Sequence, residues 1–204
     1  MKSKTLILII ILQTVFFKAQ TEIKANMVFL PVGIINIASE QALTKHITIQ
    51  EELFISPWKS IGGKHLQIYM ATLEGRYYFT ESMRKWYVGG YFSLANFNLQ
   101  KWNYWNEMVV LDENDQPVIL SDGSVRRTER YQRGYSFIFG ISGGYHFVIN
   151  EKLGLDVFAG IGSSQGLYKG FYKDNNQRSD KATGWNKSGE IIPTRGGLML
   201  TYKL

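Results

Sequence analysis

The sequence YSFIFGISGGYHF at residues 135–147 decides the fold class, because its side chains alternate in character. The even positions are mostly small or polar, whereas the odd positions form an apolar series, namely Tyr135, Phe137, Phe139, Ile141, Gly143, Tyr145 and Phe147. Successive side chains of a strand point to opposite faces, so this stretch predicts a long strand with one apolar face. A strand that crosses a bilayer needs about 9–11 residues and an apolar outward face. The stretch therefore predicts a transmembrane β-barrel.

The first 20 residues have the composition of a secretory signal peptide. Lys2 and Lys4 precede an apolar run from Leu6 to Phe17, and Lys18-Ala19-Gln20 offers a small residue for a peptidase. We expect residues 1–20 to be a signal peptide, 21–204 to be the barrel domain, and the location to be the outer membrane. An N-terminal membrane anchor is the alternative, although a spanning helix needs about 20 apolar residues.

Cysteine content and charge narrow the class of protein further. The chain has no cysteine, so an exported domain must be held by burial and hydrogen bonds, as a closed barrel is. The formal charge is +6, and Lys2, Lys4 and Lys18 of the predicted signal account for half of it. The basic residues of the remaining chain form no concentrated basic stripe, so no nucleic-acid partner is expected.

Alternating segments separated by turns predict the strand order. Six strands are expected at 46–56, 66–79, 86–99, 133–148, 153–172 and 191–203. Short turns at 80–85 and 150–152 are expected to be periplasmic, and long loops at 101–132 and 174–190 external.

A periplasmic N-terminus and an even strand number then require a hairpin in 23–43, with strands at about 23–30 and 34–43. Pro31-Val32-Gly33 is the available break; one 14-residue strand with a bulge at Pro31 is the alternative. The fold class is thus all-β, an eight-stranded antiparallel up-and-down transmembrane barrel. The faces of 86–99 stay unassigned, because both carry aromatic residues.

The predicted inward positions contain both acidic and basic residues. An interior of eight strands is just wide enough for side chains, and unpaired buried carboxylates are costly, so crosswise ion pairing is expected. The predicted lumen network consists of Glu40, Glu52, Glu74, Arg76, Asp156 and Arg195, with Lys203 near the rim. A salt-bridge plug is the main interpretation; a proton or ion pathway and catalysis by paired carboxylates are the alternatives.

Catalytic and metal-binding patterns are weak. His46, His65 and His146 have no metal-ligand spacing, so we expect no metal and no cofactor. Ser56 and His65 flank one predicted external loop and could meet as a hydrolase pair, which is the enzymatic alternative. We otherwise expect a protein that is not an enzyme and that has no catalytic residues.

The long loops combine aromatic and basic side chains that could bind a partner. Arginine pairs well with phosphate, and aromatic residues gather at membrane interfaces. The candidate binding residues are Trp102, Tyr104, Trp105, Arg126, Arg127 and Trp185. Outer-membrane lipids, lipopolysaccharide among them, are the expected partners of a monomeric protein. Solvated loops without a ligand are the alternative.

Four stretches resemble a family of Bacteroidota outer-membrane β-barrels that has no assigned function. They are INIASEQAL with Asn36 and Glu40, ISPW at 55–58, LEGRYYF at 73–79 and PTRGGLMLTYKL at 193–204. A signal that ends in Ala19-Gln20 is also typical of that phylum. The resemblance implies a small eight-stranded outer-membrane barrel and supplies no active-site residues.

The expected function is therefore a barrel with a plugged polar interior that has a structural or surface-interaction role through its external loops. A lipid-modifying hydrolase and a narrow pore are the alternatives. A soluble, lipocalin-like barrel is a further rival, and it would turn the apolar stripe inward around a ligand.

Overall fold

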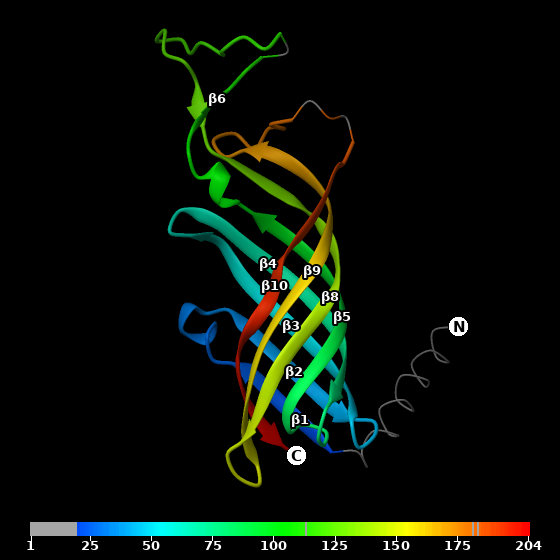
Figure 1. Cartoon of the computed structure of the whole chain (residues 1–204). Coiled ribbons are helices and arrows are strands. Elements are labelled where there is room, and N and C mark those ends of the chain that lie inside the picture. The colour runs from blue at the N-terminus through cyan, green and yellow to red at the C-terminus, as the bar shows by residue number, and fades with distance from the viewer. Residues whose placement is uncertain (1–19, 113, 181, 183) are drawn as a thin grey trace, which may run out of the picture.

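Eight long strands form a closed antiparallel barrel in the structure, a computed structural model that describes residues 20–112, 114–180, 182 and 184–204 (Figure 1). Their order around the barrel is β1-β10-β9-β8-β5-β4-β3-β2. The barrel strands are β1 (Thr21–Asn26), β2 (Ile35–Ala42), β3 (Ile47–Ile61), β4 (Lys64–Tyr78), β5 (Lys85–Leu99), β8 (Arg130–Val148), β9 (Leu153–Tyr172) and β10 (Asn186–Lys203). The prediction of an all-β, eight-stranded antiparallel fold is confirmed. The predicted signal at 1–20 lies outside the described residues, except for Gln20.

Three short elements lie in the connections. They are the 3-10 helices η2 (Leu30–Val32) and η3 (Trp102–Tyr104) and a small ribbon of β6 (Met108–Val109) with β7 (Arg127–Thr128). None of the helices in the described residues is long and apolar enough to span a membrane.

The predicted N-terminal hairpin is present. β1 pairs antiparallel with β2, and η2 contains Pro31 at the break, so the alternative of one bulged strand is wrong. β1 is shorter than the predicted 23–30, because Asn26 turns the chain. Its buried side chain accepts a hydrogen bond from Val28 N at 3.2 Å and donates one to Asn36 at 2.8 Å.

The hairpin of β3 and β4 is longer than predicted. β3 continues past residue 56 to Ile61 and turns at Gly62-Gly63, whose φ angles of 55° and 78° suit glycine. No external loop therefore lies between Ser56 and His65. β3 can contain Pro57 because the strand pairs only with β4 beyond Ile55, so the missing N–H breaks no ladder on the other side. β10 likewise begins at Asn186, which shortens the predicted 174–190 loop.

Apolar side chains cover the outside of the barrel wall. Phe137, Phe139 and Ile141 of β8 are 45%, 52% and 67% exposed, whereas the alternate residues Ser136, Ile138 and Ser142 are buried. The same alternation continues on the other strands, where the exposed apolar residues include Ile37, Leu53, Leu73, Phe92, Leu94, Leu198 and Leu200. The lipocalin-like rival, which needs this stripe inside, is wrong.

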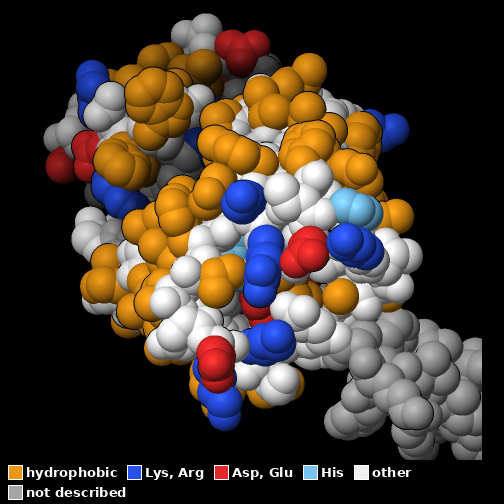
Figure 2. All heavy atoms as spheres, turned by 60° about the horizontal axis from the view of Figure 1, so that its bottom comes forward, with side chains coloured by type: hydrophobic (Ala, Val, Ile, Leu, Met, Phe, Trp, Pro, Cys, Tyr) orange, Lys and Arg blue, Asp and Glu red, His pale blue; other side chains and the backbone are white. Residues whose placement is uncertain are grey.

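The two ends of the barrel differ. The connections 43–46, 79–84 and 149–152 and both ends of the described chain lie at one end, which we call the short-turn end (Figure 1). The connections 100–129 and 173–185 lie at the opposite, long-loop end. Figure 2 shows the short-turn end, where charged side chains gather at the centre and hydrophobic side chains cover the surrounding wall.

Candidate functional site

A buried ion-pair cluster fills the half of the lumen nearest the short-turn end. We call it the lumen network; it consists of Lys24, Glu40, Glu52, Glu74, Arg76, Asp156 and Arg195, whose side chains are at most 3% exposed. Arg76 is at its centre, with ion pairs of 3.0 Å to Glu40, 2.8 Å to Glu74 and 2.7 Å to Asp156.

The two other bases extend the cluster across the barrel. Lys24 contacts Glu40 and lies 2.8 Å from Asp156. Arg195 contacts Glu52 and lies 2.9 Å from Glu74. The three bases thus meet four carboxylates, and every carboxylate has at least one cationic partner.

Neutral donors complete the coordination of the carboxylates. Tyr78 donates a 2.8 Å hydrogen bond to Glu40, Tyr87 a 2.9 Å hydrogen bond to Asp156, and Asn36 a 2.8 Å hydrogen bond to Glu52. Ser142 of β8 donates to Glu74. Tyr87 lies on β5 and Ser142 on β8, so each of the eight barrel strands supplies at least one side chain to the lumen network or to its hydrogen-bond donors. These contacts link the strands around the whole circumference of the barrel.

Two glycines make room for this cluster. A Cβ atom at Gly89 would lie 2.6 Å from Glu74 Oε1 and 2.7 Å from Ser142 Oγ. A Cβ atom at Gly144 would lie 2.5 Å from the Tyr87 hydroxyl oxygen. Both glycines therefore permit the close approach of the side chains that fill the lumen.

All six residues of the predicted lumen network lie together, and sequence reasoning missed Lys24. The polar series Glu22, Lys24, Asn26 alternates with Ile23 and Ala25, which was the available signal. Lys203, predicted near the rim, is exposed at the end of β10.

The other half of the lumen is an apolar cavity of about 310 Å³. Glu52, Arg195 and Asn36 form its floor, and Lys101 and Glu190 form a 3.0 Å ion pair among its lining residues. Its walls include the inward apolar side chains Phe54, Ile68, Met70, Ala95, Phe97, Leu99 and Ile138. The lumen is thus divided into a charged half and an apolar half.

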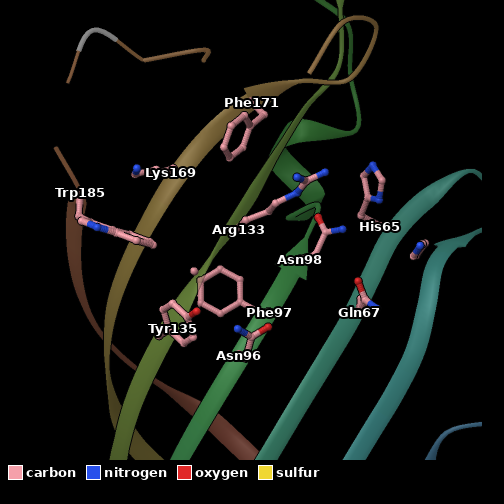
Figure 3. A pocket seen from close by; sticks show the side chains of 12 residues that line it. His65, Gln67, Asn96, Phe97, Asn98, Arg133, Tyr135, Lys169, Phe171 and Trp185 are labelled. Atoms are coloured by element: carbon pink, nitrogen blue, oxygen red, sulfur yellow. The ribbon is translucent and has the colours of Figure 1, made fainter. Parts of the chain in front are cut away.

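The outside of the barrel has a basic and aromatic groove of about 580 Å³ near the long-loop end (Figure 3). Its bases are Lys59, Arg133 and Lys169, and no carboxylate is among its lining residues. The Arg133 guanidinium lies 5.3 Å from the Phe171 ring, and Lys169 Nζ lies 4.9 Å from the Trp185 ring. Among the described residues, none of the three bases has a carboxylate within ion-pair distance. The groove can therefore accept an anion.

The predicted loop residues are not gathered into one site. Trp102 is 83% exposed, and Trp105 donates a 3.0 Å hydrogen bond to Gln100 O. Arg126 pairs with Asp174 at 2.8 Å, and Arg127 belongs to β7. Tyr104 accepts a 3.1 Å hydrogen bond from Gln132. Only Trp185, whose ring is 6.0 Å from that of Tyr135, lines the groove. Arg133 and Lys169 were missed as site residues because they lie on strands.

Ser56 and His65 do not form a nucleophile–base pair. The Ser56 hydroxyl donates to Leu66 O, and the His65 ring lies 4.5 Å from the Tyr131 ring. The described residues contain no cluster of three or more His, Asp or Glu side chains that could hold a metal ion.

Comparison with known proteins gives one match. Residues 5–204 match the family model described as protein of unknown function (DUF3575). The chain belongs to this family. No curated protein and no solved structure matches it.

In this family member, the Glu129 carboxylate connects several strands at the long-loop end through hydrogen bonds. Its carboxylate accepts hydrogen bonds from Lys173 at 2.7 Å, from Gln100 at 2.8 Å and from Lys64. Partial burial opposes ionisation, but these donors hold the pKa of the Glu129 carboxyl at about 2, below its ordinary 4.5. Glu129 thereby joins the β3–β4 hairpin to the ends of β5 and β9.

The contribution of Glu129 is expected to depend on pH. Because its pKa is lowered by folding, its stabilisation is complete above about pH 4.5 and is lost as the pH falls toward about 2. The protection of the Lys173 amide against hydrogen exchange, relative to its intrinsic rate at each pH, should decrease over this range, because the Lys173 N–H donates to Glu129 O. Glu129→Gln should show faster exchange already at neutral pH, whereas Glu81→Gln at the short-turn end should not. Equal exchange in wild type and Glu129→Gln would refute this role.

Proposed function

We propose that the protein is a monomeric, non-enzymatic barrel of the bacterial outer membrane, closed to solutes by the lumen network. One observation carries the proposal: the barrel is apolar outside and charged inside. Ile141 is 67% exposed on the wall, whereas Glu40, Glu74 and Arg76 are at most 1% exposed in the lumen. Water would be a poor solvent for such a wall, and hydrocarbon a good one.

The orientation follows from the two ends of the barrel. Outer-membrane barrels have short periplasmic turns and longer external loops, so the short-turn end is assigned to the periplasm. The resemblance to Bacteroidota outer-membrane barrels supports this location, as does the signal-like leader. The alternative of a narrow pore is not favoured, because ion pairs at 2.7–3.0 Å occupy the lumen.

The proposal is tested by membrane fractionation and by planar-bilayer recording of the purified protein. The protein should remain in the outer-membrane fraction after carbonate washing, and its gel mobility should change on boiling, as expected of a barrel that resists detergent. Pure protein should give no steady conductance. Recovery as a soluble periplasmic protein would contradict the location, and steady ion-selective currents would contradict the plug.

The groove of Figure 3 supports a second part of the proposal, a surface role in binding phosphorylated outer-leaflet lipid such as lipopolysaccharide. The groove lies on the outer face of the strands, just beyond the apolar residue Phe137 on β8. Arginine and lysine match phosphate, and Trp185 and Tyr135 are of the type that settles at the membrane interface.

Removing the groove's charges is expected to weaken lipopolysaccharide binding. Arg133→Gln with Lys169→Gln should lose about tenfold in affinity per base, because a hydrogen bond to a charged group contributes about 1.5–3 kcal/mol. The readout is the rise in melting temperature caused by lipopolysaccharide. Lys85→Gln with Lys152→Gln, at the short-turn end, is the matched control. Equal rises in both double variants would show that the groove does not bind this lipid.

A further inference from the structure

The barrel wall is incompletely paired on one side of the long-loop half. β1 contacts β10 only from Glu22↔Lys203 to Asn26↔Met199, so β10 pairs with β9 alone over Asn186–Gly197. β2 stops pairing with β3 at Ile35↔Ile55, so β3 pairs with β4 alone beyond Ile55. Two strand edges therefore face each other here without a ladder between them. The β1–β2 connection lies on the short-turn side of this gap, where the Phe29 ring is 5.3 Å from the Phe54 ring of β3.

The sequence of β10 suits a free edge. Pro193 has no N–H to donate, and a register shift follows between Pro193 and Arg195. Proline and bulges are characteristic of strands that must not pair on one side. Ile191 on this edge is 77% exposed, and Ile192 is 39% exposed. An apolar free edge is unfavourable in water but suits contact with alkyl chains.

The apolar cavity lies directly behind this unpaired edge. Its lining includes Ile192, Pro193 and Thr194 from β10 and Phe54 from β3, which are the two strands that border the gap. The opposite wall is formed by Met70, Ile138 and Ala95 on β4, β8 and β5. A ligand that passed between the edges of β10 and β3 would enter the cavity.

The lining selects an apolar ligand. Cavities lined by aliphatic and aromatic side chains stay free of water and bind apolar groups, and about 310 Å³ is at the lower end of the volumes of ligand pockets. Glu52 and Arg195 of the lumen network close the floor, so a chain cannot extend through the barrel. The other polar side chains of the lining are Lys101, Glu190, Ser188, Gln132, Thr194 and the pair Ser136 and Ser164, whose hydroxyl groups hydrogen-bond to each other at 2.7 Å.

We infer that the cavity binds one alkyl chain of a membrane lipid, which enters sideways between β10 and β3. The polar head of the lipid stays beside Lys101 and Glu190, while its chain lies against Phe54, Met70 and Ile138. This inference rests on the proposed membrane location, because only a bilayer presents alkyl chains to the unpaired edge.

Photolabelling in vesicles tests the inference. The full-length mature protein is reconstituted in phosphatidylcholine vesicles that contain a fatty acid with a diazirine near the end of its chain, and adducts are located by mass spectrometry. Contact with bulk lipid should label the outward residues Phe137 and Leu94. Occupation of the cavity should in addition label the inward residues Ile138 and Met70.

A pair of matched variants makes the result specific. Ala95→Phe fills the cavity and should reduce labelling of Ile138 and Met70 by about tenfold, which corresponds to about 1.4 kcal/mol. Ala71→Phe adds the same side chain to the outer wall of β4 and should leave inward labelling unchanged. If Ala95→Phe does not give the folded, heat-modifiable form, Ala95→Leu replaces it.

The outcomes separate this inference from the proposed location. Labelling of Phe137 and Leu94 alone would overturn the lipid site and leave the membrane location intact. Inward labelling that Ala95→Phe does not reduce would also overturn the site. No labelling on either face would contradict the membrane location itself.

Discussion

Replacing Arg76 by Met is expected to lower the free energy of unfolding by about 3–5 kcal/mol, the cost of breaking a buried ion pair by removing one partner. Arg76 contacts Glu40, Glu74 and Asp156, and its side chain is fully buried. Without it, Lys24 and Arg195 alone must balance four carboxylates. The measurement is equilibrium urea unfolding of the barrel in vesicles, followed by the change in gel mobility.

Arg84→Met is the matched control for this experiment. Arg84 is 60% exposed and pairs with Glu81 at 3.7 Å, so its loss should change the free energy of unfolding by no more than about 0.5 kcal/mol. Adding Asp156→Asn to Arg76→Met removes one uncompensated charge and should restore part of the loss. If Arg76→Met were no more harmful than Arg84→Met, the lumen network would not be a dry structural plug.

Replacing Ile141 by Arg is expected to lower the free energy of unfolding in vesicles by about 2–4 kcal/mol, the cost of a cation on the lipid face near the bilayer midplane. Ile141 lies on the apolar face of β8 and is 67% exposed. Ile119→Arg is the matched control, because Ile119 is 59% exposed but lies in the long connection 100–129. Equal effects of the two substitutions would mean that the wall of β8 does not face lipid.

Alternation predicted the faces of β8 because its two sides differ clearly. Phe137, Phe139 and Ile141 on one side alternate with serine and glycine on the other. β5 could not be oriented, because aromatic residues occupy both of its faces. Trp86 is 63% exposed, whereas Tyr87 is buried, since its hydroxyl group donates to Asp156 on β9. Such a contact between distant strands leaves no local pattern.

The lumen network could be predicted in composition, because buried carboxylates require cationic partners. Its exact membership could not be predicted: Lys24 lies within the predicted strand at 23–30, but the inward face of that strand was not assigned. The apolar half of the lumen could not be predicted. Phe54 and Met70 share inward faces with Glu52 and Thr72, so these faces change from polar to apolar along one strand, and a simple alternation rule misses that change.

Spin labelling along β8 tests the central claim, which is that the apolar wall faces lipid and the lumen is dry. The chain contains no cysteine, so single cysteines can be placed at positions 137 to 142 without background labelling. In vesicles, labels at 137, 139 and 141 should be accessible to oxygen, which concentrates in hydrocarbon, and inaccessible to a water-soluble nickel chelate. A label at 142, whose native serine donates to Glu74 of the lumen network, should be shielded from both reagents. High accessibility of 137, 139 and 141 to the nickel chelate would place this face in water and contradict the account.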